Sequence, residues 1–350
     1  MHVKSILTVL LSFIFLVGIA QDSLKKEDWL PVFDNKLPTR FFTLQLDGIF
    51  QHSITSTSDL EEIGDGYAEI LGNRIFSTGI KFPVLNKEKV VLTGGVKYID
   101  EEFYFDDYDP VDYPLYVGLN DRNLKSLGVN FNGFFNVNKN RSIIMRSSFS
   151  LAGDFYRSGD YFNFDDLLKI SLALGYGIKR NDDTYIAFGG YLGYTFGKPS
   201  VYPAFVYHKQ FKSGIGFEAV LPQTIRVWNK FSEKFYLYGR SKITGNSYTV
   251  RLYSSVLDQA ESLQLRNSNI ITTVGIYQRF AKWIWLQAEA GYCNSLNFNV
   301  SETNFVPGST LPKPDTDYLI KSDVTGAPFV SVSLFLSPPK DLINKFLNLN

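Results

Sequence analysis

The feature that most constrains this chain is a regular alternation of apolar and small or polar residues over long stretches. Residues 167–180 read LLKISLALGYGIKR, in which the even positions from 168 to 178 carry large apolar side chains. The odd positions between them carry mostly lysine, serine, alanine and glycine. Successive side chains of a strand point to opposite faces, so this period of two predicts a β-strand with one apolar face.

The glycine-rich stretch YIAFGGYLGYTF at 185–196 alternates in the same way. The polar turn sequence NDDT (181–184) separates it from the first stretch, and together they predict a β-hairpin. A nucleotide-binding glycine loop would need a helix after it, but the next run, GKPSVYPAFVYHKQF, is again strand-like. These glycines are therefore expected where a strand bends or leaves space.

Similar stretches recur at 90–103, 124–137, 142–155, 284–293 and 329–337. Most are longer than an ordinary strand of about 5–6 residues and reach the roughly 9–11 residues that a tilted strand needs to cross a bilayer. Their less apolar faces are rich in glycine, alanine, serine and asparagine. Such a face suits the interior of a closed barrel, while the bulky aliphatic face suits lipid.

Short and long connections alternate between these stretches. The short ones are NKEK (86–89), NKNR (138–141), NDDT (181–184), FKSG (211–214), FSEK (231–234) and AKW (281–283), and the long polar ones are 56–66, 104–123, 156–166, 254–264 and 301–323. The sequence therefore predicts an all-β fold, a single antiparallel transmembrane β-barrel of about 14 strands, with short periplasmic turns and long extracellular loops. The ambiguous segment 198–248 leaves a barrel of about 12 strands as the alternative.

The N-terminus predicts export. Lys4 precedes the apolar stretch ILTVLLSFIFLVGIA (6–20), which ends in small residues before Gln21. This pattern predicts a signal peptide at 1–20, with an N-terminal membrane anchor as the alternative. We expect a periplasmic segment at 21–40, the barrel at 41–337 and a C-terminal tail at 338–350. No later apolar run is long enough for a spanning helix, so an outer-membrane location is expected.

Composition excludes several classes of function. Lys plus Arg and Asp plus Glu are both 35, so the formal net charge is zero, which argues against nucleic acid as a partner. Cys293 is the only cysteine and is expected to be buried in a strand. After the signal peptide only His52 and His208 remain, too few for a zinc site. We expect neither a metal nor a cofactor.

Two groups of residues are candidates for contact with solutes. Charged and amide side chains on the less apolar faces are expected to face the lumen, namely Lys97, Asn130, Arg146, Lys169, Lys179 and Glu289. The stretch DEEFYFDDYDPVDYP (100–114) predicts an acidic extracellular loop containing Asp106, Asp107, Asp109 and Asp112. This loop is expected to be solvated, and binding of divalent ions is its alternative role.

Three tryptophans and one histidine are the remaining candidate functional residues. Trp228, Trp283 and Trp285 lie near tight turns and predict an aromatic girdle at the membrane–water interface, with core packing as the alternative. His208 is a weak candidate for catalysis, since a barrel hydrolase would pair a histidine with a serine. No serine of this chain lies in a G-x-S-x-G context. The other interpretation of His208 is a polar residue of the lumen.

The signal peptide, Gln21, the long strands rich in Tyr, Phe and Asn, and the segment VYPAFVYHKQFKSGIGFEAVLPQTIRVW (201–228) resemble uncharacterised outer-membrane β-barrel proteins of Bacteroidota. The resemblance covers roughly 40–337 and implies a porin-like barrel without an established activity. Many barrels end on an aromatic residue that serves assembly, whereas this chain ends on Asn350.

The expected function is a passive pore or uptake channel for small solutes, because the predicted lumen face is polar. The alternatives are a barrel enzyme that hydrolyses lipid or acyl esters through His208, and a structural or adhesin barrel. The expected partners are outer-membrane lipid, lipopolysaccharide and the barrel-assembly machinery.

Overall fold

Strands make up most of the chain that the structure describes. The computed structural model describes residues 37–87, 89–155, 164–252, 263–302 and 318–337. The expected signal peptide at 1–20, most of the 21–40 segment and the tail at 338–350 lie outside these residues. Within the described ranges, no helix is both long and apolar enough to cross a membrane.

The elements, in chain order, are β1 (Phe42–Ile49), β2 (His52–Thr57), β3 (Gly66–Lys87), β4 (Val90–Asp109), α2 (Pro114–Asp121), β5 (Leu124–Asn138), β6 (Arg141–Gly153), α3 (Phe164–Leu167), β7 (Leu168–Asn181), β8 (Thr184–Gly193), β9 (Ser200–Gln210), β10 (Ile215–Leu221), β11 (Thr224–Ser232), β12 (Phe235–Val250), β13 (Leu263–Arg279), β14 (Ile284–Glu302), β15 (Tyr318–Val324) and β16 (Ala327–Leu336).

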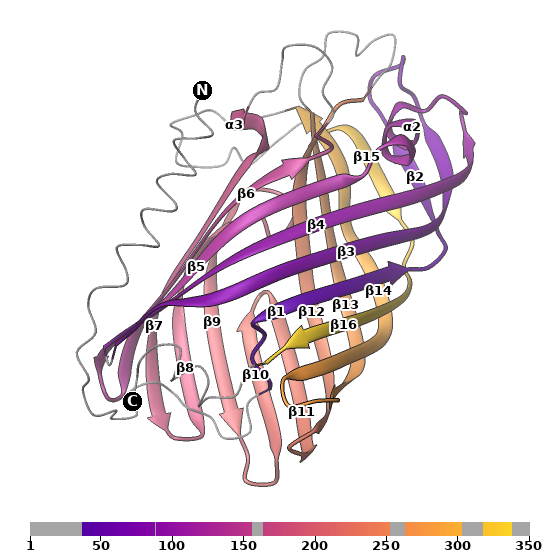
Figure 1. Ribbon diagram of the computed structural model, residues 1–350. Coiled ribbons are helices and arrows are strands. Elements are labelled where there is room, and N and C mark those ends of the chain that lie inside the picture. Colours follow the sequence, from indigo (N-terminus) through magenta and orange to yellow (C-terminus); the bar gives the residue numbers. More distant parts are fainter. Residues whose placement is uncertain (1–36, 88, 156–163, 253–262, 303–317, 338–350) are drawn as a thin grey trace, which may run out of the picture.

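All strands belong to one sheet that closes on itself (Figure 1). β1 pairs antiparallel with β3 on one side and with β16 on the other, where Phe42 lies opposite Leu336. β1 and β2 are two parts of one strand, as are β15 and β16, so the barrel has 14 strands. This confirms the predicted all-β antiparallel barrel, and the ambiguous middle of the chain forms β9 to β12.

The connections at the two ends of the barrel differ in length. Short turns join β3 to β4, β5 to β6, β7 to β8, β9 to β10, β11 to β12 and β13 to β14, at the positions that the sequence predicted. We call this the short-turn end. At the opposite, long-loop end the connections are longer, except for Pro222 and Gln223 between β10 and β11.

The predicted loop at 104–123 is wrong in part. β4 stays paired with β3 as far as Tyr67 opposite Asp109, and Phe103 and Phe105 continue its alternation on the buried face. Helix α2 then follows, with Pro114 in its first turn. The acidic residues Asp106, Asp107 and Asp109 therefore lie on a strand, while Asp112 lies in the connection to α2, and all four are exposed.

The side chains alternate between an apolar outer face and a more polar inner face. On β16, for example, Val330 and Val332 are exposed, while Ser331 and Ser333 between them are buried. Large exposed apolar side chains of the outer face include Leu44, Leu46, Leu172, Leu174, Phe188, Val201, Phe205, Ile225, Val227, Val274 and Leu334. An outer surface of this kind is stable against lipid tails and costly in water.

An apolar core occupies the interior at the long-loop end, which lies at the top of Figure 1. Helix α2 contributes Leu115, Tyr116 and Leu119, which pack against strand residues such as Ile70 and Leu265. The Tyr116 hydroxyl lies 2.9 Å from Ser56 Oγ and 3.0 Å from the Gly66 carbonyl oxygen. Helix α2 is therefore held inside the mouth of the barrel rather than above it.

A contact between β6 and β12 narrows the same end. The two strands are not neighbours in the sheet order, yet Gly153 and Thr249 pair in parallel and Asp154 N donates to Thr249 O at 3.0 Å. A Cβ atom on Gly153 would lie 2.6 Å from that carbonyl oxygen. Only glycine permits this approach, because every other residue carries a Cβ.

An aromatic cluster lines the interior at the short-turn end and contradicts the predicted girdle for Trp228 and Trp285. Trp228 and Trp285 are 2% and 5% exposed and pack with Tyr236, Tyr238, Tyr277 and Phe335. Trp285 shares the inner face with Gln287, and the Trp228 ring covers the backbone of Gly216. The alternation of each strand thus points both rings inward. Trp283, which is 39% exposed, lies in the turn between β13 and β14.

Candidate functional site in the barrel lumen

Between the two apolar ends, the inner face carries charged and amide side chains. Lys97 on β4 and Arg146 on β6 point inward from opposite sides of β5, on which Asn130 lies. Asn130 Oδ1 accepts a hydrogen bond from Asn132 Nδ2 at 3.3 Å. Lys97 and Arg146 are exposed to solvent although they face the interior, so the lumen is hollow at this level.

Other charges that the sequence analysis did not single out lie close by. Lys81, on the inner face of β3, is likewise exposed and lies within electrostatic range of Lys97, Arg146 and Arg40. Asp47 on β1 lies within range of Lys97, and its carboxylate accepts hydrogen bonds from Gln45 Nε2 at 2.8 and 3.0 Å. This part of the lumen therefore gathers more positive than negative side chains.

Glu289 is the centre of a buried network on the opposite wall. Its carboxylate pairs with Arg240 and accepts hydrogen bonds from Tyr238 Oη at 2.6 Å and Thr273 Oγ1 at 3.1 Å. The Glu289 side chain is 0% exposed. A buried carboxylate with this many donors is satisfied, so Glu289 orders the wall and is not an open site for a cation.

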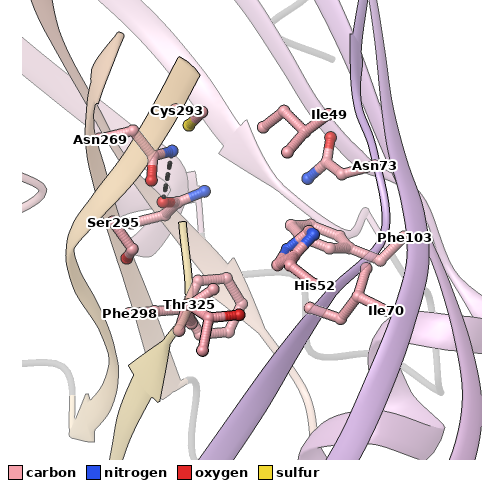
Figure 2. A pocket seen from close by; sticks show the side chains of 12 residues that line it. Ile49, His52, Ile70, Asn73, Phe103, Asn269, Cys293, Ser295, Phe298 and Thr325 are labelled. Atoms are coloured by element: carbon pink, nitrogen blue, oxygen red, sulfur yellow. Dashed lines mark hydrogen bonds between the residues drawn. The ribbon is translucent and has the colours of Figure 1, made fainter. Parts of the chain in front are cut away.

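A pocket lies at the border of the apolar core (Figure 2). The buried carboxylate of Glu101 contacts two of the residues that line it. Glu101 accepts hydrogen bonds from Asn73 Nδ2 at 3.0 Å, Tyr248 Oη at 3.0 Å and Asn267 Nδ2 at 3.4 Å. Asn73 and Asn267 line the pocket together with apolar residues such as Phe103, and Cys293 lies at its edge. The pocket wall thus mixes polar and apolar side chains.

Two of the expected lumen residues are engaged with their surroundings. Lys169 Nζ donates to Gln264 Oε1 at 2.6 Å and to the Asp166 carbonyl oxygen at 2.9 Å, and its side chain is buried near the β6–β12 contact. Lys179 forms an ion pair of 2.8 Å with Asp182 at a short turn. Both face inward, at opposite ends of β7, so neither belongs to the mid-lumen group.

The residues that precede β1 enter the barrel at the short-turn end. The Arg40 guanidinium carbon lies 4.8 Å from the centre of the Phe335 ring and 5.8 Å from that of Tyr277. Arg40 also donates to Gln287 Oε1, and Leu37 packs on the aromatic cluster. Arg40 thus brings a further positive charge into the lumen.

His208 lies on the inner face of β9 and is 4% exposed. Its Nδ1 is 3.6 Å from Glu218 Oε2, and its ring centre is 5.6 Å from that of Trp228. This arrangement favours a packed residue of the wall over the catalytic histidine considered above.

The acidic residues after Phe105 do not form a metal site. Asp106, Asp107, Asp109 and Asp112 are exposed at the rim of the long-loop end. Within the described ranges, no group of three or more His, Cys, Asp or Glu residues is arranged to hold a metal ion.

Sequence reasoning missed Arg226, Arg240 and Lys242, which lie on the inner faces of β11 and β12. The alternation of Tyr236, Tyr238, Arg240 and Lys242 with Leu237 and Gly239 carried the signal. The ambiguous strand boundaries between 198 and 248 obscured this alternation.

No family model matches the chain, and no curated protein matches it. Similar solved structures include an outer-membrane channel from Pseudomonas putida F1, with 9% identity, 87% of this chain and 98% of that chain covered, and a TM-score of 0.37. The toluene transporter TodX of P. putida has 9% identity, with 85% and 90% covered and a TM-score of 0.32. The outer membrane protease OmpT of Escherichia coli has 7% identity, with 87% and 100% covered and a TM-score of 0.28. At this level the likeness says nothing about what the chain does.

Proposed function

We propose that this chain is an outer-membrane β-barrel channel, a passive pore or uptake channel for small polar solutes. The observation that carries the proposal is the solvent exposure of Lys81, Lys97 and Arg146, which face the interior of a closed barrel. Inward side chains remain exposed only where the lumen holds solvent. A 14-strand barrel is wider than its own side chains fill.

The apolar outer face supports a place in a bilayer, and the export signal expected at 1–20 makes that bilayer the outer membrane. The proposed surroundings are outer-membrane lipid and lipopolysaccharide, with insertion by the barrel-assembly machinery. Kinship with the barrels of Bacteroidota remains part of this proposal. The apolar core around α2 narrows the long-loop end, so we expect modest conductance in the unaltered protein.

The proposal is tested with the purified full-length chain in planar lipid bilayers. A second variant replaces the α2 segment 111–122 with a glycine–serine linker. We expect stepwise ionic currents from the unaltered chain and larger steps from the variant, because its apolar plug is absent. If neither protein conducts after verified insertion into the bilayer, the channel proposal is wrong.

A further inference from the structure

The inner wall of the barrel is more basic than acidic. Inward-facing basic side chains include Lys81, Lys97, Arg146, Arg226, Arg240 and Lys242, while the acidic ones include Asp47, Glu101, Glu218 and Glu289. The whole sequence has a formal net charge of zero. The positive excess of the lumen therefore arises because basic side chains face inward more often than acidic ones. A charge excess inside a low-dielectric wall raises the local concentration of counter-ions.

Several of these cations form no ion pair with a carboxylate. Arg240 is paired with Glu289. Among the described residues, Lys81, Lys97, Arg146 and Lys242 have no carboxylate oxygen within ion-pair distance. Asp47 lies within electrostatic range of Lys97 and Lys242, and Glu289 lies within range of Lys242. These carboxylates offset part of the positive charge, but none of them forms an ion pair with the four cations.

The cations without an ion pair also lie near one another. Lys97 is within electrostatic range of Arg146 and Arg40, and Lys81 is within range of all three. Lys242, on the far wall, is within range of Arg240 and Lys97 as well as of the carboxylates of Asp47 and Glu289. Like charges gathered in this way repel each other, and an anion between them removes that cost.

We propose that Lys81, Lys97, Arg146 and Lys242 form an oxyanion-binding site in the middle of the lumen and make the channel selective for small anions. This inference rests on the proposed channel function and names its solute class. Carboxylate and phosphate groups share the required chemistry, since a guanidinium binds either with two parallel hydrogen bonds. Ammonium groups such as those of Lys81 and Lys97 add compact positive charge around the same anion.

The test measures the reversal potential of the channel in a potassium chloride gradient. We expect chloride to permeate more readily than potassium by roughly an order of magnitude at low salt, the lower end of what charge-lined clefts achieve. The preference is expected to shrink in 1 M salt, where the screening length falls to about 3 Å. The double variant Lys97→Gln/Arg146→Gln is expected to lose most of the preference.

A matched control removes the same two kinds of charge from the outer face. Arg74 on β3 and Lys209 on β9 point away from the lumen, so Arg74→Gln/Lys209→Gln is expected to keep the anion preference. Inorganic phosphate and acetate, added separately, are each expected to reduce the chloride current of the unaltered channel. Phosphate block without acetate block would assign the site to phosphate, and the reverse result would assign it to carboxylates.

The two proposals fail in different ways. A silent bilayer contradicts the channel function itself. A conducting channel that prefers potassium or shows no preference overturns only the anion site, as does an equal loss of preference in the lumen and outer-face variants.

Discussion

Tyr116 on helix α2 lies with its hydroxyl oxygen 2.9 Å from Ser56 Oγ on β2, although the two residues are 60 positions apart in the sequence. Tyr116 is fully buried, so this contact and the nearby Gly66 carbonyl hold the helix inside the barrel mouth. The closure of the long-loop end therefore depends on a helix that is fixed by its own side chains to two strands.

The same contact predicts a loss of stability at high pH. Burial raises the pKa of Tyr116 from 10.0 to about 12. Below pH 10 Tyr116 is neutral in both the folded and the unfolded chain, so its full contribution to the free energy of unfolding is present. Between pH 10 and 12 it ionises only in the unfolded chain, which lowers the free energy of unfolding by about 2–3 kcal/mol. The measurement is the denaturant midpoint in detergent across this pH range.

Tyr116→Phe is the control for that titration, because it keeps the ring and removes the ionisable group. Its loss of hydrogen bonding is expected to cost about 1 kcal/mol at neutral pH. Its stability should then fall less steeply with pH than that of the unaltered chain. Parallel pH profiles for the two proteins would show that Tyr116 is not the responsible group.

A substitution at Gly153 tests whether the contact between β6 and β12 stabilises the barrel. A Cβ at this position would lie 2.6 Å from Thr249 O and 2.7 Å from Leu167 Cδ2, so Gly153→Ala is expected to destabilise the barrel by about 1–3 kcal/mol through overpacking. Gly190→Ala on β8 is the control, because nothing lies within 4 Å of its Cβ position. Thermal unfolding in detergent compares the two, and equal transition temperatures would mean that the strands are not in contact.

Removal of the buried Glu289 carboxylate is expected to lower the stability of the barrel strongly. In Glu289→Ala the Arg240 guanidinium would remain without its partner, and its side chain is 11% exposed, so we expect a cost of about 3–5 kcal/mol. Glu102→Ala breaks the Arg74 pair, whose side chains are 58% and 27% exposed, and should cost only about 0–1 kcal/mol. Chemical denaturation measures both, and similar losses would contradict the buried network.

The inward placement of Trp285 predicts its fluorescence in lipid. A variant that keeps Trp285 as its only tryptophan should resist quenching by lipids with brominated acyl chains, because the ring is 5% exposed on the inner face. The comparison is a variant whose only tryptophan comes from Phe188→Trp, at a position that is 55% exposed on the outer face. If lipid quenches Trp285 as strongly as the outer tryptophan, the girdle interpretation stands and the inward placement is wrong.

The sequence predicted the wall of the barrel better than its contents. Strands such as 167–180 and turns such as NDDT follow from local alternation and turn chemistry, which do not depend on distant residues. Helix α2 was hidden in a predicted loop, although Pro114 is a common first residue of a helix. Its burial depends on contacts with β2 and β3, which no local pattern contains.

The site was predictable in the same partial way. Alternation indicated that Lys97 and Arg146 share the inner face, but not that Lys81 and Lys242 lie near them, because that proximity depends on strand register and barrel closure. For the tryptophans, two sequence features led to different predictions. Their positions beside turns indicated the membrane interface, whereas the parity of Trp285 with Gln287 and Glu289 correctly indicated the lumen.

The most direct measurement of the central claim is covalent modification of the lumen during conduction. In a Cys293→Ser background, Lys97→Cys places the only thiol in the middle of the proposed pathway, and Lys209→Cys places it on the outer face. A bulky, membrane-impermeant thiol reagent should reduce the current through the Lys97→Cys channel and leave the Lys209→Cys channel unchanged. Complete modification of Cys at position 97, verified by mass spectrometry, with no change in current would contradict a conducting lumen.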